Sequence, residues 1–255
     1  MASSFCIALR RFARRDDNLS VMESASPTIA LEGVWKYYGD YPALRDYTFR
    51  VSEGSCCALL GRNGAGKTTL LRVLAGLSPF QKGSIAVLGS KPRAAEARRA
   101  TGFLGHGIGV YEDLTARENL RFFSHVSGGG DLNEWLERVD LLRVADIPVR
   151  QYSRGMRQRL ALARTFLSRP RVLLLDEPFT SLDDRAIKML SQLLREARDR
   201  GATILFSTHQ IRDAMAIASH VALIEQGKLR YSGERTQAML DDPALLYREY
   251  TELGG

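Results

Sequence analysis

The chain has 255 residues, of which 45% are hydrophobic and 25% charged, and these are ordinary values for a globular protein. This length suits one large α/β domain with room for an inserted subdomain, and no apolar run approaches the roughly 18 residues that span a bilayer, so we expect no integral membrane segment. The formal net charge of +7 favours an anionic partner without choosing among nucleotide, nucleic acid and anionic lipid.

The first 26 residues form a basic segment before Pro27. They carry four arginines but also two adjacent acids, Asp16 and Asp17, and they lack the apolar core of a secretory signal. The acids disfavour an organelle transit peptide. We predict a disordered or weakly amphipathic tail over residues 1–26, with Met22 as an alternative start and a short membrane-surface helix as the competing interpretation.

Three cysteines, Cys6, Cys56 and Cys57, give an odd count with two adjacent members and no metal-binding spacing. Buried, reduced thiols of a cytosolic protein are the expected reading.

After Pro27 the hydrophobic pattern becomes regular. Ile29–Val34 and Thr48–Val51 alternate apolar and polar residues, as half-exposed strands do, and a turn-rich stretch at 38–42 separates them. Ser55–Leu60 is an apolar run that enters a glycine-rich loop, and Thr68–Leu77 then has helical spacing.

The second half alternates between helical and strand patterns. Residues 94–168 are expected to be mostly helical, including a helix over Leu132–Val144. Further strands and the helix between the first two of them are predicted at Val172–Leu175, Asp184–Arg200, Thr203–Ser207 and His220–Glu225. This alternation indicates a mainly parallel α/β core.

The glycine-rich loop fits the pattern G-x-x-x-x-G-K-[ST] without a mismatch, between a predicted strand and a predicted helix. Backbone N–H groups of such a loop surround phosphates, and the helix N-terminus adds its positive dipole end. Lys67 can reach the β- and γ-phosphates, and the Thr68 hydroxyl can bind Mg²⁺. The predicted nucleotide-binding residues here are Gly61, Arg62, Asn63, Gly64, Ala65, Gly66, Lys67, Thr68 and Thr69.

A pair of acids follows the apolar run Val172–Leu175, at the end of a strand where ligands of open α/β sheets gather. Asp176 is placed to hold Mg²⁺, directly or through water. Glu177 is the next residue and can orient and deprotonate the attacking water. We therefore predict Asp176 as a metal residue, with Glu177 and Lys67 as catalytic residues.

With these motifs in order, residues 28–235 resemble the nucleotide-binding domains of ABC transporters. Residues 152–159 look like the family signature, residues 181–183 match its D-loop, His209 matches its switch histidine, and Tyr38 matches the aromatic residue that stacks on adenine. The resemblance implies two subunits packed head to tail, with ATP between one phosphate loop and the partner's signature. Ser153 and Gly155 would then meet the γ-phosphate from the opposite side, and His209 would hold water and Glu177 in line.

The chain departs from the family pattern at two places. Arg154 and Met156 replace a glycine and the glutamine of the usual signature. His106 stands where the family has a coupling glutamine, and an imidazole can take over its hydrogen bonds. The segment from Leu104 to Phe123 is in turn similar to the ATP-binding subunits of haem exporters in cytochrome c maturation.

The resemblance implies an α/β fold: a P-loop NTPase core of the ABC ATPase type, with an N-terminal antiparallel β element and an inserted α-helical subdomain at about 92–170 within a 27–255 domain. It implies ATP and Mg²⁺ as ligands, a homodimer or other ABC-ATPase dimer, integral membrane transporter subunits as partners, and a peripheral place on the cytoplasmic face of the inner membrane. No nucleic-acid partner is expected. The function implied is ATP hydrolysis that drives export, with haem as the cargo. Two alternatives stay open, an exporter ATPase for a lipid, drug or polysaccharide and a non-transport ABC ATPase acting on nucleic acid or ribosomes.

Overall fold

The structure is a computed structural model that describes residues 27–105, 107, 109–209, 211–242 and 244–250, with the side chains of 212 and 213 left aside. The predicted basic tail, Cys6 and His106 lie outside the described residues.

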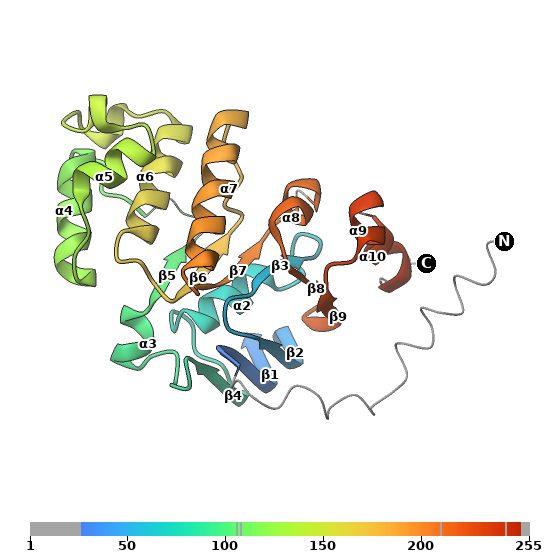
Figure 1. Ribbon diagram of the computed structural model, residues 1–255. Coiled ribbons are helices and arrows are strands. Elements are labelled where there is room, and N and C mark those ends of the chain that lie inside the picture. The colour runs from blue at the N-terminus through green and yellow to red at the C-terminus, as the bar shows by residue number, and fades with distance from the viewer. Residues whose placement is uncertain (1–26, 106, 108, 210, 243, 251–255) are drawn as a thin grey trace.

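Two sheets form the framework (Figure 1). A three-stranded antiparallel sheet has the order β2-β1-β4, and a six-stranded sheet has the order β5-β6-β7-β3-β8-β9. All neighbours in the larger sheet are parallel except the edge pair β8 and β9. The strands are β1 (Ile29–Tyr38), β2 (Tyr41–Val51), β3 (Cys56–Leu60), β4 (Lys82–Val87), β5 (Thr101–Leu104), β6 (Val172–Asp176), β7 (Thr203–Ser207), β8 (His220–Glu225) and β9 (Lys228–Glu234).

The central strands are buried on both faces, which explains why they are continuous apolar runs. In β3, Cys56, Ala58 and Leu60 belong to one core, while Cys57 and Leu59 belong to the other. One core lies between the six-stranded sheet and the helices on one of its faces, from α4 to α8. The second core fills the space between the six-stranded sheet, α2 and the three-stranded sheet. Burial on both faces is typical of parallel sheets covered by crossover helices.

Six of the helices in the described part of the chain fall into three groups (Figure 1). Helix α2 lies between the two sheets, α7 and α8 cover the far face, and α4, α5 and α6 pack together beyond the β5 edge. The helices are α2 (Lys67–Leu74), α3 (Ala95–Arg99), α4 (Ala116–Ser127), α5 (Leu132–Arg138), α6 (Arg154–Phe166), α7 (Asp184–Asp199), α8 (Ile211–Ile217), α9 (Gln237–Asp241) and α10 (Leu245–Tyr250), with 3-10 turns at Leu142–Val144 and Val149–Gln151.

The antiparallel N-terminal sheet and the parallel-rich core confirm the predicted fold class, but the stretch expected to be mostly helical contains a core strand. Strand β5 pairs in parallel with β6. A side chain at Gly102 would place its Cβ 2.6 Å from the carbonyl oxygen of Thr165, so glycine lets the strand approach α6. This strand depends on a contact some sixty residues away, which a local pattern does not reveal.

The predicted helix over Leu132–Val144 is shorter than expected. It ends at Arg138, Asp140 takes a positive φ of 55°, and a 3-10 turn follows at Leu142–Val144. Leu136, Val139 and Leu141 are all buried in the core, so apolar residues continue at short intervals past the end of the helix. Among the described residues, no helix is both long and apolar enough to cross a membrane.

Candidate nucleotide-binding site

The phosphate loop turns between β3 and α2 in a space that only glycine fits at two positions. A Cβ on Gly61 would lie 2.4 Å from the carbonyl oxygen of Ile224, and one on Gly66 would lie 2.7 Å from that of Ala43. Gly66 also has a φ of +113°, a backbone conformation that side chains disfavour. As the N-cap of α2, Gly66 offers no side-chain cap to the first N–H groups of the helix, so they are available to an anion.

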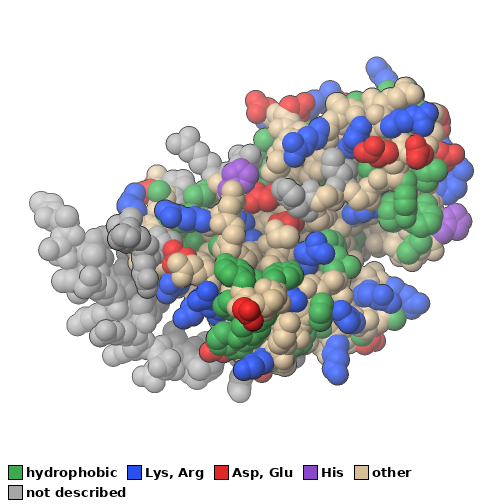
Figure 2. All heavy atoms as spheres, turned by 180° about the vertical axis from the view of Figure 1, so that it is seen from behind, with side chains coloured by type: hydrophobic (Ala, Val, Ile, Leu, Met, Phe, Trp, Pro, Cys, Tyr) green, Lys and Arg blue, Asp and Glu red, His purple; other side chains and the backbone are tan. Residues whose placement is uncertain are grey.

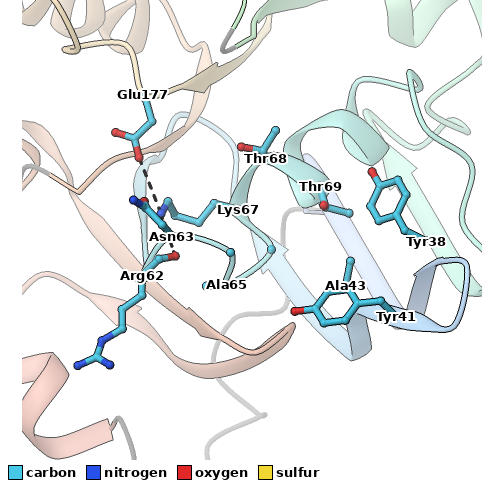
Figure 3. A pocket seen from close by; sticks show the side chains of 12 residues that line it. Tyr38, Tyr41, Ala43, Arg62, Asn63, Ala65, Lys67, Thr68, Thr69 and Glu177 are labelled. Atoms are coloured by element: carbon cyan, nitrogen blue, oxygen red, sulfur yellow. Dashed lines mark hydrogen bonds and ion pairs between the residues drawn. The ribbon is translucent and has the colours of Figure 1, made fainter.

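A pocket opens over this loop and the N-terminus of α2 (Figure 3). It is lined by the predicted loop residues from Arg62 to Thr69, by Glu177, and by Tyr38, Tyr41 and Ala43. The Tyr38 side chain is 49% exposed and lies under the Lys36 ammonium, 4.6 Å from its ring centroid. Tyr41, 56% exposed, was not predicted as a site residue, although a second aromatic residue in the same turn could have suggested it.

The Lys67 side chain is held inside the loop rather than extended into solvent. Its Nζ donates to the carbonyl oxygen of Gly61 at 2.6 Å and to that of Arg62 at 3.3 Å, and lies 3.8 Å from Glu177 Oε1 (Figure 3). Burial lowers the pKa of this amino group, and the carboxylates of Glu177 and Asp176 oppose that shift. The loop thus contains a desolvated cation beside the place where phosphates would bind.

Asp176 connects the acidic strand to the phosphate loop. Thr68 Oγ1 donates to Asp176 Oδ2 at 2.8 Å, and Ser207 Oγ donates to Asp176 Oδ1 at 2.6 Å. Asp176 is only 2% exposed, so both carboxylate oxygens are satisfied in a buried position. Ser207, at the end of β7, was not predicted as part of the site, because its role depends on the pairing of β6 with β7.

Glu177 follows Asp176 with a positive φ of 51°, and its backbone N–H donates to both the carbonyl oxygen and the Oγ of Ser207. Its carboxylate points toward Lys67 on one side and His209 on the other, where Nδ1 lies 2.8 Å from Oε2. The backbone N–H of His209 also donates to Oε2 at 3.3 Å. The structure therefore brings together three residues predicted to be catalytic.

The residues present fit a magnesium ion bound together with a nucleotide. In the described part of the chain, no cluster of three or more His, Cys, Asp or Glu side chains could hold a metal. Thr68 and Asp176 together offer a hydroxyl and a carboxylate at one point. Mg²⁺ typically takes one or two protein oxygens and completes its shell with phosphates and water, so this pair would suffice.

The signature-like segment lies elsewhere in the subunit. Ser153 is the N-cap of α6 and accepts from the backbone N–H of Met156 at 3.2 Å. Gly155 abuts the segment after Glu177, since a Cβ there would lie 3.2 Å from the carbonyl oxygen of Ser181. Neither Ser153 nor Gly155 lines the phosphate pocket as the structure describes it, so within one subunit they do not meet the phosphate loop.

Comparison with known proteins shows which family has this sequence. The family model described as ABC transporter matches residues 44–180. The Nod factor export ATP-binding protein I of Sinorhizobium fredii is 36% identical over 234 residues, which are 89% of this chain and 68% of that protein. A probable sulfate/thiosulfate import ATP-binding protein CysA of Chlorella vulgaris is 36% identical over 224 residues, 85% of this chain and 94% of that one.

A solved structure shares the fold. The dimeric structure of a post-hydrolysis state of the ATP-binding cassette MJ0796 bound to ADP and Pi superposes with a TM-score of 0.75 at 24% identity, over 82% of this chain and 99% of that one.

Proposed function

The chain belongs to the ABC transporter family as an ATPase subunit, and we propose that it hydrolyses ATP in a head-to-tail dimer that drives separate membrane subunits. The observation that carries the proposal is the position of Glu177 between Lys67 and His209, at the rim of the phosphate loop. A carboxylate in that place can accept a proton from water as the water attacks a γ-phosphate.

Each residue of the site has a role that follows from its chemistry. Tyr38 and Tyr41 offer aromatic faces to the adenine, while the loop N–H groups and Lys67 bind the phosphates. Thr68 and Asp176 would hold Mg²⁺, which supplies charge neutralisation when bound. His209 keeps the Glu177 carboxylate directed and can donate toward the γ-phosphate.

Two features support a dimer. Ser153 and Gly155 lie at the N-terminus of the 13-residue helix α6, and neither residue lines the phosphate pocket of its own subunit. A phosphate bound in this subunit could therefore contact a signature segment only from a second subunit. MJ0796, which shares the fold, forms a dimer with ADP and Pi bound. Closure would therefore complete each site with the partner's helix N-terminus.

An exposed aromatic cluster is the surface we assign to the membrane subunit. The rings of Tyr111, Phe122 and Phe123 pack together at centroid distances of 5.2 to 5.9 Å, with Tyr111 stacked on Phe123 and Phe122 edge-to-face with both, and Tyr111 is 50% exposed. Figure 2 shows hydrophobic side chains gathered at the end of the molecule where α4 lies. Exposed aromatic side chains grouped in this way mark a protein-binding surface. They follow His106 in the sequence, which was predicted to take part in coupling.

Haem remains the cargo that we propose, on the similarity of the segment from Leu104 to Phe123 to haem-exporter subunits. The relatives bear names with other cargo, Nod factor and sulfate/thiosulfate, so an ATPase for another substrate is the second candidate. Reconstitution with the membrane subunits in vesicles separates the two. Stimulation of ATP hydrolysis by haem supports the first, and no response to haem contradicts it.

Turnover and dimerisation of the purified chain test the general proposal. Wild type with Mg²⁺ and ATP should hydrolyse ATP, whereas Glu177→Gln should bind ATP without turnover and migrate as a dimer in gel filtration. Glu53→Gln changes an exposed glutamate that is not among the residues lining the phosphate pocket, and this matched control should behave as wild type. ATP-bound Glu177→Gln that stays monomeric, also with membrane subunits added, would contradict the sandwich mechanism.

A further inference from the structure

Two arginines of helix α6, the helix that begins after Ser153, join it to the segment that carries the exposed aromatic cluster. Arg157 and Arg164 are about two helical turns apart, so both side chains leave the same face of α6. Both donate hydrogen bonds to the segment between β5 and α4, which follows the predicted coupling position His106 and includes Tyr111. The predicted site residues include neither arginine.

Arg157 fixes the backbone immediately before Ser153. Its Nε donates to the carbonyl oxygen of Tyr152 at 3.1 Å, its Nη2 donates to that of Arg150 at 3.0 Å, and its Nη1 donates to Glu112 Oε1 at 2.7 Å. The Arg157 side chain is only 26% exposed, so these bonds are partly shielded from water. One planar guanidinium therefore connects the signature to an acid that lies 45 residues earlier in the chain.

Glu112 comes directly after Tyr111, whose peptide groups are fixed by a buried amide. Asn119 of α4 is fully buried. Its Oδ1 accepts from the backbone N–H of Tyr111 at 2.8 Å, and its Nδ2 donates to the carbonyl oxygen of Tyr111 at 2.9 Å. The carbonyl oxygen of Glu112 in turn accepts from the backbone N–H of Arg150 at 2.8 Å. The ring of Tyr111 and the carboxylate of Glu112 therefore belong to one short, hydrogen-bonded stretch of backbone.

Arg164 holds the same segment at a second point. Its guanidinium donates to the carbonyl oxygen of Phe103 at 3.1 Å and to that of Gly109, and it lies 5.0 Å from the ring centroid of Phe123. Phe123 is a member of the aromatic cluster, and a guanidinium over an aromatic face is attracted to it. A displacement of the cluster would therefore act on α6 through two side chains.

We propose that Arg157 is a positioning residue for the contact that Ser153 makes with ATP in the dimer, and that Glu112 ties it to the surface assigned to the membrane subunit. This inference rests on the proposed function, since Ser153 meets a phosphate only in the dimer. A signature held in its contact position loses less entropy when the dimer closes, so loss of the guanidinium weakens ATP-driven dimerisation. ATP binding to a monomer is unaffected, because Arg157 does not line the phosphate pocket.

The test measures dimerisation with Mg²⁺ and ATP by analytical ultracentrifugation in the Glu177→Gln background, which should retain bound ATP. The dimer Kd should rise about tenfold in Arg157→Gln, because each dimer contains the contact twice. Glu112→Gln should raise it about threefold, since the backbone bonds of Arg157 remain. The double variant should be no weaker than Arg157→Gln alone, as expected for two residues that act as one unit.

Asp146→Asn is the matched control. Asp146 accepts from Arg117 Nε at 2.8 Å and from Nη2 at 3.2 Å, Arg117 is likewise 26% exposed, and the pair joins α4 to the loop between the two 3-10 turns. The dimer Kd of this variant should stay within about twofold of the parent. In every variant the Kd of the monomer for ATP, measured by fluorescence of trinitrophenyl-ATP at low protein concentration, should also stay within about twofold.

Thermal unfolding separates positioning from a loss of stability, because a merely structural ion pair would lower the Tm in Asp146→Asn and Glu112→Gln alike and leave dimerisation unchanged. An unchanged dimer Kd in Arg157→Gln, an equal rise in Asp146→Asn, or additive effects of Arg157→Gln and Glu112→Gln overturns the inference. Failure of the proposed function looks different. The Glu177→Gln parent would then stay monomeric with ATP, alone or with membrane subunits, and the inference would fall with it.

Discussion

The Nδ1 atom of His209 lies 2.8 Å from Oε2 of Glu177, across 32 residues of sequence, and Lys67 Nζ lies 3.8 Å from the other oxygen of the same carboxylate. The Glu177 side chain is thus shared between the loop that binds phosphate and the residue that follows β7. We expect an incoming γ-phosphate to compete for both partners, which would link nucleotide binding to the freeing of this carboxylate.

Replacement of His209 by alanine should lower ATP turnover by about 100-fold or more, because the Glu177 carboxylate loses its orienting partner and the γ-phosphate loses a donor. The Kd for ATP should change by no more than a few fold, since the loop and Lys67 are intact. Steady-state hydrolysis and fluorescence binding measure the two effects.

His125→Ala is the control for that substitution, because His125 is an exposed residue on α4 whose ring nitrogen Nδ1 lies 2.7 Å from the carbonyl oxygen of Arg121 on the same helix. It should retain wild-type turnover. Equal losses in both variants, or full activity in His209→Ala, would show that His209 has no specific role.

Affinity for ATP should fall at alkaline pH earlier than an ordinary lysine would predict. Burial lowers the pKa of Lys67, so the amino group of the free protein loses its proton as the pH rises through that lowered pKa, and the neutral amine binds phosphate less well. Isothermal titration between pH 7 and pH 10 should show a rising Kd over this range.

Lys67→Arg supplies the comparison, because a guanidinium keeps its proton throughout and its Kd, although larger overall, should be nearly flat with pH. Lys67→Met should bind ATP about 10- to 100-fold more weakly at pH 7. A Kd in wild type that does not vary with pH would contradict a lowered pKa of Lys67 in the free protein.

Ser207→Ala should destabilise the protein by about 1–3 kcal/mol, because its hydroxyl donates to buried Asp176 at 2.6 Å and accepts from the N–H of Glu177 at 3.0 Å. Turnover should fall as well, since both acids lose a fixed partner. Urea unfolding and ATP hydrolysis check the two expectations. Ser191→Ala removes a hydroxyl that donates to the carbonyl oxygen of Ile187 on its own helix, and it should change stability by less than about 0.5 kcal/mol.

Cys56 and Cys57 should be unreactive toward thiol reagents in the folded protein. Burial raises the pKa of the Cys56 thiol to about 12 and that of Cys57 further still. In a Cys6→Ser variant, labelling by Ellman's reagent at pH 8 should require unfolding. Rapid labelling of two thiols in the native protein would contradict the buried position of β3.

The same burial makes stability depend on alkaline pH. Above the ordinary thiol pKa the unfolded chain loses protons that the native thiols keep, so the free energy of unfolding falls as the pH rises from about 8.5 toward 12. Urea unfolding between pH 8 and pH 10 should show this slope, and a Cys56→Ala, Cys57→Ala double variant should show a smaller one. An equal slope in both proteins would assign the effect to other groups.

His209 was predicted from the resemblance to the nucleotide-binding domains of ABC transporters, whereas the sequence alone determined the phosphate loop and the acidic strand end. Each is a local motif in which the order of residues fixes the chemistry: Gly66 permits a conformation that other residues resist, and an apolar strand must place Asp176 and Glu177 at its end. The alternation of strands with helices likewise predicted a mainly parallel core, because period and composition are local properties.

Only the tertiary structure revealed the features that depend on contacts between segments far apart in the sequence. Strand β5 exists because its backbone pairs with β6 and Gly102 admits α6, and Ser207 joins the site because β7 lies beside β6. Tyr247 lines a cavity together with Gly61 because the chain returns to the sheet after β9. Local periodicity records which residues are buried, but the neighbours that a buried residue meets are fixed by the register and order of the strands.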